Sequence, residues 1–247
     1  MTLILPLMFI SCQKTPVAHF STDTLEPEVG HDVLFNNDSQ NAAKFEWDFG
    51  DGYISSEKNP SHVFTSNSKL DVTLTATSKS GTSDKASITL NVMIPTLLVV
   101  EVLEWNNEAV VVPDASILLY NSLEDWNSNK PELSVNEGFT DVNGIAVFAN
   151  LNPSVYYIDV YEATHDNWDF GNPINGILYI RSPQVMSHQI NWFVAWVDVV
   201  NHGTGQARGP RPLVIKKIER KSLHMYLPAT GRTENWQDLY NRRVIKK

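Results

Sequence analysis

The sequence predicts an all-β protein of two tandem β-sandwiches, followed by a C-terminal extension that contains a hairpin. Short segments in which apolar and polar residues alternate recur through residues 16–200, and clusters of Gly, Pro, Asn, Asp and Ser separate them. The chain has 247 residues, of which 42% are hydrophobic and 19% are charged. This length and composition allow two domains of ordinary size, each with its own buried core.

Composition and motifs exclude several classes of protein. The single Cys excludes an intramolecular disulfide and a multi-cysteine metal site. No apolar run reaches the roughly 18 residues that a membrane-spanning helix needs. Neither Gly-x-Ser-x-Gly nor His-Glu-x-x-His occurs, and the seven His residues are scattered along the chain. We therefore expect a protein that is not an enzyme and that uses no metal or cofactor.

The N-terminus carries a possible export and anchoring signal. Residues 3–10 form an apolar segment of signal-peptide length, and Ser11 and Cys12 follow directly. A small residue before a Cys at this place resembles the lipobox of bacterial lipoproteins. The resemblance implies a signal peptide at residues 1–11, lipidation of Cys12, a linker at residues 12–15, and an outer-membrane location on the periplasmic or the surface face. The alternative is a soluble secreted protein with an unmodified Cys12.

The first domain is expected at residues 16–94. Residues 44–49 alternate between polar and apolar, which predicts a strand with Phe45, Trp47 and Phe49 on one face. Further strands are predicted at residues 32–35, 70–76 and 86–92, with turn-forming residues between them. Short strands at this spacing are typical of a β-sandwich of roughly 80 residues.

A hexapeptide in this domain resembles the signature of PKD domains. Its residues are Trp47, Asp48, Phe49, Gly50, Asp51 and Gly52. Residues 16–21 resemble the opening strand of that family, and residues 59–64 resemble its Pro-x-His-x-Tyr segment. The resemblance implies an immunoglobulin-like fold without catalytic residues, which serves as a spacer or as an adhesion and glycan-contact module on cell surfaces.

The residue types of the hexapeptide suit structural roles. Trp47 offers a large apolar surface to a core, and glycines at 50 and 52 allow backbone angles that a β-carbon disfavours. The side chains of Asp48 and Asp51 can accept hydrogen bonds from the N–H groups of their own turn. The alternative role is calcium binding, for which suitable oxygen ligands come from Asn37, Asp38, Asp48 and Asp51.

The second domain is expected at residues 95–200. Strands are predicted at residues 97–103, 113–120, 145–148, 155–161, 177–180 and 190–200. The Thr140-Asp141-x-x-Gly144 segment and the later Tyr-x-Ile-x-Val alternation resemble the carboxypeptidase-regulatory-like (transthyretin-like) β-sandwich, although Pro153 stands near the family's usual Gly. The resemblance implies a non-catalytic sandwich, found as a stalk or a carbohydrate-associated module.

An aromatic loop follows the fourth of these strands. Residues 165–172 combine turn formers with Trp168 and Phe170. These two rings either contact a ligand, by stacking on a sugar, or plug one end of the sandwich.

The C-terminal extension, residues 201–247, is basic. Residues 206–247 hold 11 Lys and Arg but only three acids, in a chain whose net charge is −9. The extension either packs on the acidic body of its own chain or contacts an anionic partner. Residues 213–218 and 222–227 predict the hairpin, and residues 234–243 predict a short helix with Trp236, Leu239 and Tyr240 on one face.

Together these features predict a non-catalytic lipoprotein of the cell envelope. It would serve as a binding, adhesion or scaffold component of an outer-membrane assembly. The alternative is a glycan-binding protein of a polysaccharide uptake system. The expected partners are the membrane, through the lipid anchor, and other envelope proteins or glycans. Nucleic acid is not an expected partner, because the whole chain is acidic.

Overall fold

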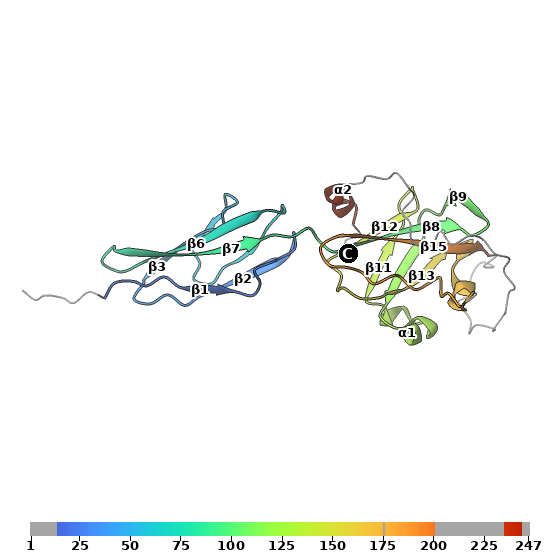
Figure 1. Cartoon of the computed structure of the whole chain (residues 1–247), viewed down its shortest axis with the longest axis horizontal. Coiled ribbons are helices and arrows are strands. Elements are labelled where there is room, and N and C mark those ends of the chain that lie inside the picture. Colours follow the sequence, from blue (N-terminus) through green and yellow to red (C-terminus); the bar gives the residue numbers. More distant parts are fainter. Residues whose placement is uncertain (1–13, 175, 201–234, 244–247) are drawn as a thin grey trace, which may run out of the picture. The chain divides into compact units, whose positions relative to one another are not determined.

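The computed structural model describes residues 14–174, 176–200 and 235–243. It divides into two compact units, Met1–Met93 and Ile94–Lys247, which we call unit 1 and unit 2. Both consist mainly of β-strands, so the all-β prediction is confirmed (Figure 1). Cys12 and the hairpin predicted at residues 213–227 lie outside the described residues. Among the described residues, no helix is long and apolar enough to span a membrane.

Unit 1 is a sandwich of two antiparallel sheets. Its strands are β1 (Phe20–Thr22), β2 (Asp32–Asn37), β3 (Lys44–Asp48), β4 (Ile54–Ser55), β5 (Ser61–Val63), β6 (Lys69–Thr77) and β7 (Ser83–Asn91). One sheet has the order β1–β2–β5 and the other the order β4–β3–β6–β7 (Figure 1). Neighbouring strands are antiparallel throughout.

Aromatic side chains fill the space between the two sheets of unit 1. Trp47 on β3 is fully buried, and its ring meets the edge of Phe20 on β1, with 5.0 Å between ring centroids. Phe35 on β2 contacts both Trp47 and Phe49, at 5.7 and 5.4 Å. The alternation along β2 and β3 turns these residues inward because successive side chains of a strand point to opposite faces.

Unit 2 contains two sheets that a short strand connects. Its strands are β8 (Leu97–Glu104), β9 (Asn107–Val111), β10 (Ser116–Tyr120), β11 (Asn136–Phe139), β12 (Ile145–Ala149), β13 (Tyr157–Glu162), β14 (His165–Asp166) and β15 (Ile190–Val199). The pairing order is β11–β10–β13–β14–β15–β8–β12, and β9 pairs with β8. β8 and β15 run parallel, with Ile190 opposite Leu97 and Val197 opposite Glu104.

The main core of unit 2 lies between these sheets. Val100 and Val102 of β8 pack in one cluster with Ile117 of β10, Val160 of β13 and Phe193 of β15, all nearly inaccessible to water. The outer faces of the sheets carry two further apolar clusters. Both faces of β8 are therefore buried, which agrees with its nearly continuous apolar sequence.

Two short α-helices cover the outer faces. Helix α1 (Leu123–Asn127) buries Trp126, whose Nε1 donates a hydrogen bond to the carbonyl of Ile158 at 3.1 Å. Helix α2 (Trp236–Asn241) lies within the helix predicted at residues 234–243, and the Asn235 side chain caps its first turn. Leu239 of α2 is fully buried in the cluster with Leu97, Val99, Ile145 and Val147.

One predicted strand is wrong. Residues 177–180 are not a strand; Ile177 makes only an isolated bridge to Ile174. Tyr179 and Ile180 are nevertheless buried, in the cluster that includes Trp105 and Phe170. Their apolar side chains thus pack an irregular segment against the core. An apolar pattern of only four residues does not distinguish such a segment from a strand.

Candidate functional site

A groove lies on the outer face of unit 2, where β10, β11 and β13 form a sheet. The described residues that line it are Ser116, Leu118, Asn129, Pro131, Glu137, Asp159 and Tyr161, and its volume is about 420 Å³. We call it the sheet groove. The volume falls within the range of small-molecule sites, about 300–1,000 Å³.

Strand alternation places these side chains in the groove. Ile117 and Leu119 of β10 point into the main core, so Ser116 and Leu118 point to the opposite face. On β13, Ile158 and Val160 belong to the same core, which turns Asp159 and Tyr161 outward. The lining residues come from three strands and one loop, and they are spread over residues 116–161. No short sequence motif therefore predicts the groove. Asp159, between the apolar residues Ile158 and Val160, is a sequence signal that could have indicated the groove, but no site was predicted from it.

The PKD-like hexapeptide forms a turn stabilised by its own aspartates. Asp48 Oδ1 accepts a hydrogen bond from the N–H of Gly50 at 2.9 Å, and Asp51 Oδ1 accepts one from the N–H of Tyr53 at 3.1 Å. Gly50 and Gly52 both have positive φ, +80° and +95°. The hexapeptide residues therefore have the structural surroundings expected from their types, with Trp47 and Phe49 buried.

His62 joins this turn to the other sheet of unit 1. Its Nε2 lies 2.7 Å from Asp51 Oδ2, and its ring stacks on Phe49 with 4.2 Å between centroids and an angle of 9°. Because β5 carries His62 and the turn follows β3, the contact links the two sheets. The second carboxylate oxygen of Asp51 is thus already engaged by a protein partner.

The four residues considered for calcium have local partners. Asn37 Oδ1 accepts a hydrogen bond from the N–H of Ser39, and Asp38 Oδ1 accepts one from Asn36 Nδ2. Asp48 and Asp51 accept bonds within the turn. In the described part of the chain, no group of three or more His, Cys, Asp or Glu side chains is placed to hold a metal ion.

The two aromatic residues of the loop at residues 165–172 lie in different surroundings. Phe170 is only 1% exposed and packs against Trp105 and Tyr179, so its ring plugs the sandwich and offers no face to a sugar. Trp168 is half-buried beside Trp126, with 6.2 Å between ring centroids. The loop itself contains strand β14 and the 3₁₀-helix Trp168–Gly171. The structure therefore corrects the ligand-contact prediction for Phe170.

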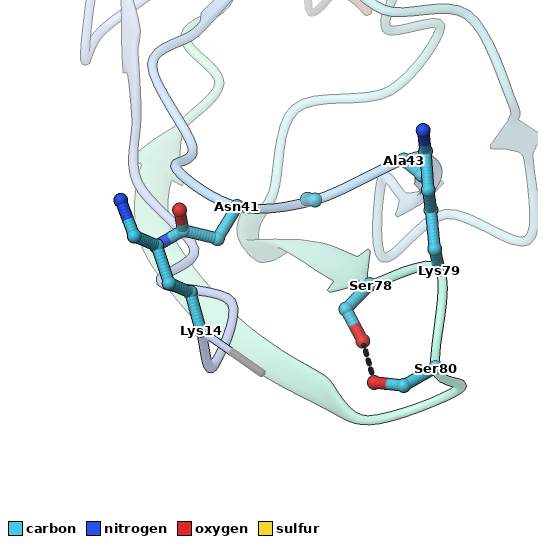
Figure 2. Close-up of a pocket in the computed structure, with 7 residues that line it drawn as sticks. Lys14, Asn41, Ala43, Ser78, Lys79 and Ser80 are labelled. Atoms are coloured by element: carbon cyan, nitrogen blue, oxygen red, sulfur yellow. Dashed lines mark hydrogen bonds between the residues drawn. The ribbon is translucent and has the colours of Figure 1, made fainter. Parts of the chain in front are cut away.

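A second hollow lies at one end of unit 1. Lys14, Asn41, Ala42, Ala43, Ser78, Lys79 and Ser80 line a volume of about 350 Å³. Figure 2 shows Lys14 and Lys79 on opposite sides of this hollow. Ser78 Oγ lies 2.8 Å from Ser80 Oγ and 2.7 Å from Thr82 Oγ1, so the hydroxyl groups bond to one another. The two charges of this hollow are carried by exposed, flexible lysine side chains, which makes it a weaker binding candidate than the sheet groove.

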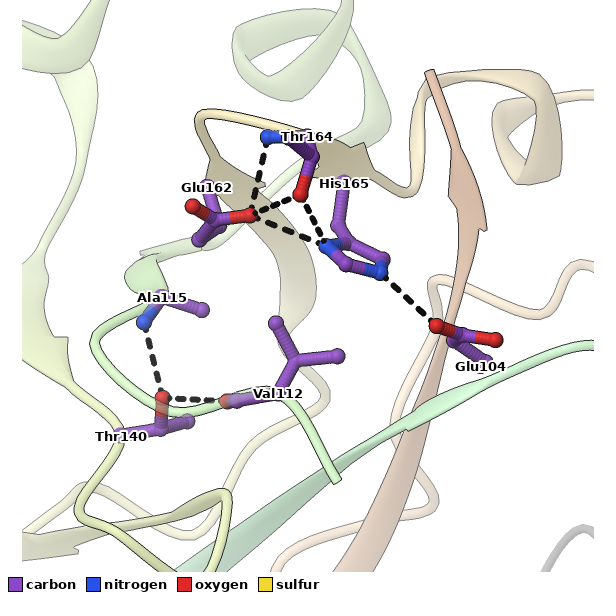
Figure 3. Close-up of polar contacts among 7 residues, drawn as sticks. All are labelled: Glu104, Val112, Ala115, Thr140, Glu162, Thr164 and His165. Atoms are coloured by element: carbon purple, nitrogen blue, oxygen red, sulfur yellow. Dashed lines mark hydrogen bonds and ion pairs between the residues drawn. The ribbon is translucent and has the colours of Figure 1, made fainter. Parts of the chain in front are cut away.

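A histidine with two glutamates lies where β14 connects the sheets of unit 2 (Figure 3). His165 Nδ1 lies 2.9 Å from Glu162 Oε2, and its Nε2 lies 3.1 Å from Glu104 Oε1. Thr164 donates hydrogen bonds to Glu162 from its backbone N–H and its hydroxyl, at 2.9 and 2.8 Å. We call these four residues the histidine cluster.

The pKa values of the histidine cluster follow from these contacts. Burial alone would lower the pKa of His165, but its hydrogen bonds to Glu162 and Glu104 outweigh burial and raise the pKa above 6.5. Burial alone would raise the pKa of Glu162, yet the bonds from His165 and Thr164 lower it from 4.5 to about 2. The two carboxylates favour the protonated form of His165, and the cluster bridges β8, β13 and β14.

The Thr140-Asp141 motif of unit 2 has a structural role. The buried Thr140 hydroxyl donates to the carbonyl of Val112 at 2.7 Å and accepts from the N–H of Ala115 at 2.8 Å (Figure 3). Asp141 accepts hydrogen bonds from the N–H groups of Asn143 and Ile145 and forms an ion pair with Arg242 just after α2. At least this part of the basic extension therefore packs on its own chain.

Comparisons with known proteins identify one part of the chain. Residues 13–94 match the family model of the PKD domain. Similar solved structures include the PKD1 domain of Vibrio anguillarum Epp, 32% identical over 34% of this chain and 99% of that domain, with a TM-score of 0.30. The PKD1 domain of the Vibrio cholerae metalloprotease PrtV is 34% identical over 32% and 98%, with a TM-score of 0.29.

The other comparisons are less informative. BcpA, the major pilin subunit of Bacillus cereus, is 10% identical over 75% of this chain and 70% of its own, with a TM-score of 0.39. No curated protein sequence matches the chain significantly.

Proposed function

Since residues 13–94 form a PKD domain, we propose that the chain is a non-catalytic lipoprotein of the bacterial cell envelope. Its role is to bind or hold other envelope molecules. The PKD domain acts as a spacer, and unit 2 carries the binding surface. One observation carries the anchoring part of the proposal: the PKD match begins at residue 13, directly after Ser11 and Cys12. Lipid chains on Cys12 would therefore be attached next to a folded spacer.

The hydrogen bonds of the polar side chains in the turn after β3 support the proposed role of unit 1 as a spacer. The carboxylates of Asp48 and Asp51 accept hydrogen bonds from their own turn, and Asp51 also contacts His62. Side chains that are occupied in this way stabilise a fold and leave little for a ligand. Unit 2 contains the sheet groove, whose lining includes Glu137, Asp159 and Tyr161.

Fractionation of cells that express the full chain tests the anchor. The wild-type protein should sediment with membranes and incorporate a clickable palmitate analogue, because several acyl chains bind membranes tightly. Cys12→Ala should move it to the soluble fraction without label. Ser11→Ala is the matched control, since it keeps a small residue before the Cys and should leave labelling intact. Membrane sedimentation of Cys12→Ala equal to wild type would refute a lipid anchor at Cys12.

A second candidate function is glycan binding within a polysaccharide uptake system. The sheet groove favours it, because the groove combines carboxylates with an aromatic ring in a volume suited to a small molecule. The aromatic loop is a poorer candidate for this role, since Phe170 is buried.

A further inference from the structure

We propose that one end of unit 1 lies on an anionic phospholipid surface, with lysine side chains against the lipid phosphates. We call it the lysine end and define it by the exposed residues Lys14, Lys44 and Lys79. The inference rests on the proposed lipid anchor at Cys12 and names the surface that the anchored domain contacts. Two separate observations carry it: the distribution of charge along unit 1, and the short length of chain between Cys12 and Lys14.

Strand register brings the three lysines to the same end of unit 1. Lys44 begins β3 and lies opposite Thr77, the last residue of β6. Lys79 follows in the turn between β6 and β7, and together with Lys14 it lines the hollow of about 350 Å³ (Figure 2). In the described part of the chain, none of the three ammonium groups forms an ion pair. All three charges are therefore open to an external anion.

Unit 1 is otherwise acidic, and acids gather at its opposite end. Residues 14–93 contain 11 Asp and Glu but only six Lys and no Arg. Glu28 forms a bridge with Met93, and Pro27 accepts a hydrogen bond from the N–H of Met93 at 2.8 Å. Glu26 and Glu28 therefore lie beyond the end of β7 that is remote from its turn. We call this the acidic end.

This separation of charge gives unit 1 a direction. Asp84, near the start of β7, belongs to the lysine end, and its Oδ2 accepts a hydrogen bond from the N–H of Ala18 at 2.9 Å. A single carboxylate that already bonds to the backbone does not offset three lysines. An anionic surface attracts the lysine end and repels the acidic end, which orients unit 1 on that surface.

The lysine end is also the end that the proposed anchor would reach. Cys12 precedes Lys14 by two residues, which span at most about 7 Å. At physiological salt, charges interact over about 8 Å. Acyl chains on Cys12 would therefore hold the lysine end within reach of lipid phosphates. Because β7 extends about 27 Å from this end, the start of unit 2 after Met93 would lie away from the lipid.

The neutral polar groups of the hollow already have partners. Ser78 Oγ bonds to the hydroxyl groups of Ser80 and Thr82, and Asn41 Nδ2 donates a hydrogen bond to the carbonyl of Thr15 at 3.2 Å. Recognition therefore depends on lysine charge, and each lysine should contribute about fivefold to membrane affinity. We expect phosphatidylglycerol and phosphatidylserine to bind equally well, and phosphatidylcholine not to bind.

The test places a fluorophore at either end of unit 1 in the full chain. Cys12 is the single Cys, so Cys12→Ala gives a background without acyl chains in which an introduced Cys is the only labelling site. Ser83→Cys places the label at the lysine end, and Ser66→Cys places it before β6, at the acidic end. Both serines are exposed. The probe is vesicles of equal parts phosphatidylcholine and phosphatidylglycerol that carry a quencher on their headgroups.

We expect the label at Ser83 to be quenched and the label at Ser66 to stay largely unquenched. The position of the label is the readout because residues 206–247 are basic too and attract the same vesicles. Lys14→Gln combined with Lys79→Gln should raise the lipid concentration for half-maximal quenching at Ser83 by at least about tenfold. Matched pairs of substitutions then separate the role of charge at this end from that of charge elsewhere.

Lys14→Arg combined with Lys79→Arg keeps the charge and should keep quenching within about twofold of the unsubstituted chain. Lys58→Gln combined with Lys69→Gln removes equal charge from two exposed lysines that do not line the hollow, and it should also stay within about twofold. All four positions are exposed, so none of these changes removes a core contact.

Any of five results would overturn the inference. The first is equal quenching of the two labels, and the second is an equal effect of the two glutamine pairs. The third is an arginine pair as weak as the glutamine pair at the same positions. The fourth is equal quenching on vesicles of phosphatidylcholine alone. The fifth is loss of quenching when inorganic phosphate replaces chloride at the same ionic strength, which would reassign the hollow to a free anion.

The vesicle test and the fractionation test fail separately. The vesicle test uses a chain in which Cys12 is replaced, so it measures the lysine end without acyl chains. The fractionation test measures acylation and does not depend on the lysines. Equal quenching of the two labels would therefore leave the lipid anchor standing, and unlabelled wild-type protein would leave the charge of the lysine end standing.

Discussion

At the scale of single residues, buried or half-buried histidines join parts of the fold that are distant in the sequence. His62 connects the turn after β3 to the opposite sheet through Asp51, and His165 connects β14 to β8 through Glu104. Both side chains have defined structural partners, Asp51 and Phe49 for His62 and two glutamates for His165. Each histidine therefore contributes to stability in a way that its position in the sequence does not reveal.

The histidine cluster predicts a pH dependence for the stability of unit 2. The pKa of His165 is raised, so its contribution is complete below about pH 6.5 and is lost as pH rises through the raised value. The pKa of Glu162 is lowered to about 2, so its contribution is complete above about pH 4.5 and is lost as pH falls toward 2. The cluster should therefore stabilise unit 2 most between about pH 4.5 and pH 6.5.

Thermal unfolding between pH 5 and pH 9 checks this prediction. The wild-type chain should lose on the order of 1 kcal/mol of unit 2 stability above pH 7 relative to His165→Gln, a modest amount because water screens a cluster near the surface. Glu108→Gln, an exposed glutamate on β9, is the control and should follow the wild-type profile. If the difference in unit 2 stability between wild type and His165→Gln were constant across this pH range, the raised pKa of His165 would be contradicted.

At the scale of elements, the turn after β3 depends on its two glycines to different degrees. Both have positive φ, which disfavours any residue with a β-carbon. A β-carbon at Gly50 would also lie 2.9 Å from the carbonyl oxygen of Asp71 on β6, whereas one at Gly52 would meet nothing within 4 Å. Gly50 thus permits a close approach between the turn and the neighbouring strand.

Alanine at these two positions should therefore have unequal effects. Gly52→Ala should cost about 1–2 kcal/mol of unfolding free energy, from backbone strain alone. Gly50→Ala should cost about 1–3 kcal/mol more, because the β-carbon meets backbone that cannot easily move. Urea denaturation of both variants measures this difference in unfolding free energy. Equal losses of unfolding free energy would show that the close approach of Gly50 to Asp71 does not affect stability.

Helix α2 shows how a short element depends on its surroundings. A helix of six residues is marginal in water, and here Leu239 is buried against both β8 and β12. Arg242, directly after the helix, pairs with Asp141, whose pKa is lowered: burial would raise it, but hydrogen bonds from Arg242 and two backbone N–H groups outweigh that effect. Trp236 and Tyr240 pack against the same apolar cluster that buries Leu239, so these three residues lie on one face of the helix.

At the scale of the whole molecule, the chain consists of two units that each have their own core. The aromatic core of unit 1 is centred on Trp47, and the main core of unit 2 consists mostly of aliphatic side chains from both of its sheets. We therefore expect two unfolding transitions, since each core can be lost without the other.

A variant in one core should then affect one transition only. Trp47 is fully buried and its Nε1 donates a hydrogen bond to the carbonyl of Glu57 at 2.9 Å, so Trp47→Ala should cost unit 1 about 3–5 kcal/mol. Calorimetry should show the unit 1 transition lowered by more than about 10 °C and the unit 2 transition unchanged. Tyr53→Ala, at an exposed position, should move neither. A common shift of both transitions would contradict the separate cores.

Much of unit 1 could be predicted from the sequence. Alternation along residues 44–49 and the turn residues after it were sufficient to place β3, the buried Trp47 and the capping roles of Asp48 and Asp51. These features depend on interactions within a few residues, where local chemistry decides the outcome. The contact of His62 with Asp51 was not predictable in this way, because it depends on how the two sheets face each other.

The sequence by itself determined the all-β class, the order of most strands and the turn chemistry of the PKD domain, since strand periodicity and turn residues act locally. Tertiary structure alone decided the parallel pairing of β8 with β15, the histidine cluster and the sheet groove. Each of these joins residues that are tens of positions apart, and their proximity follows from strand register and sheet order. The groove is the clearest case: Glu137, Leu118 and Asp159 form one row only because three strands pair in that register.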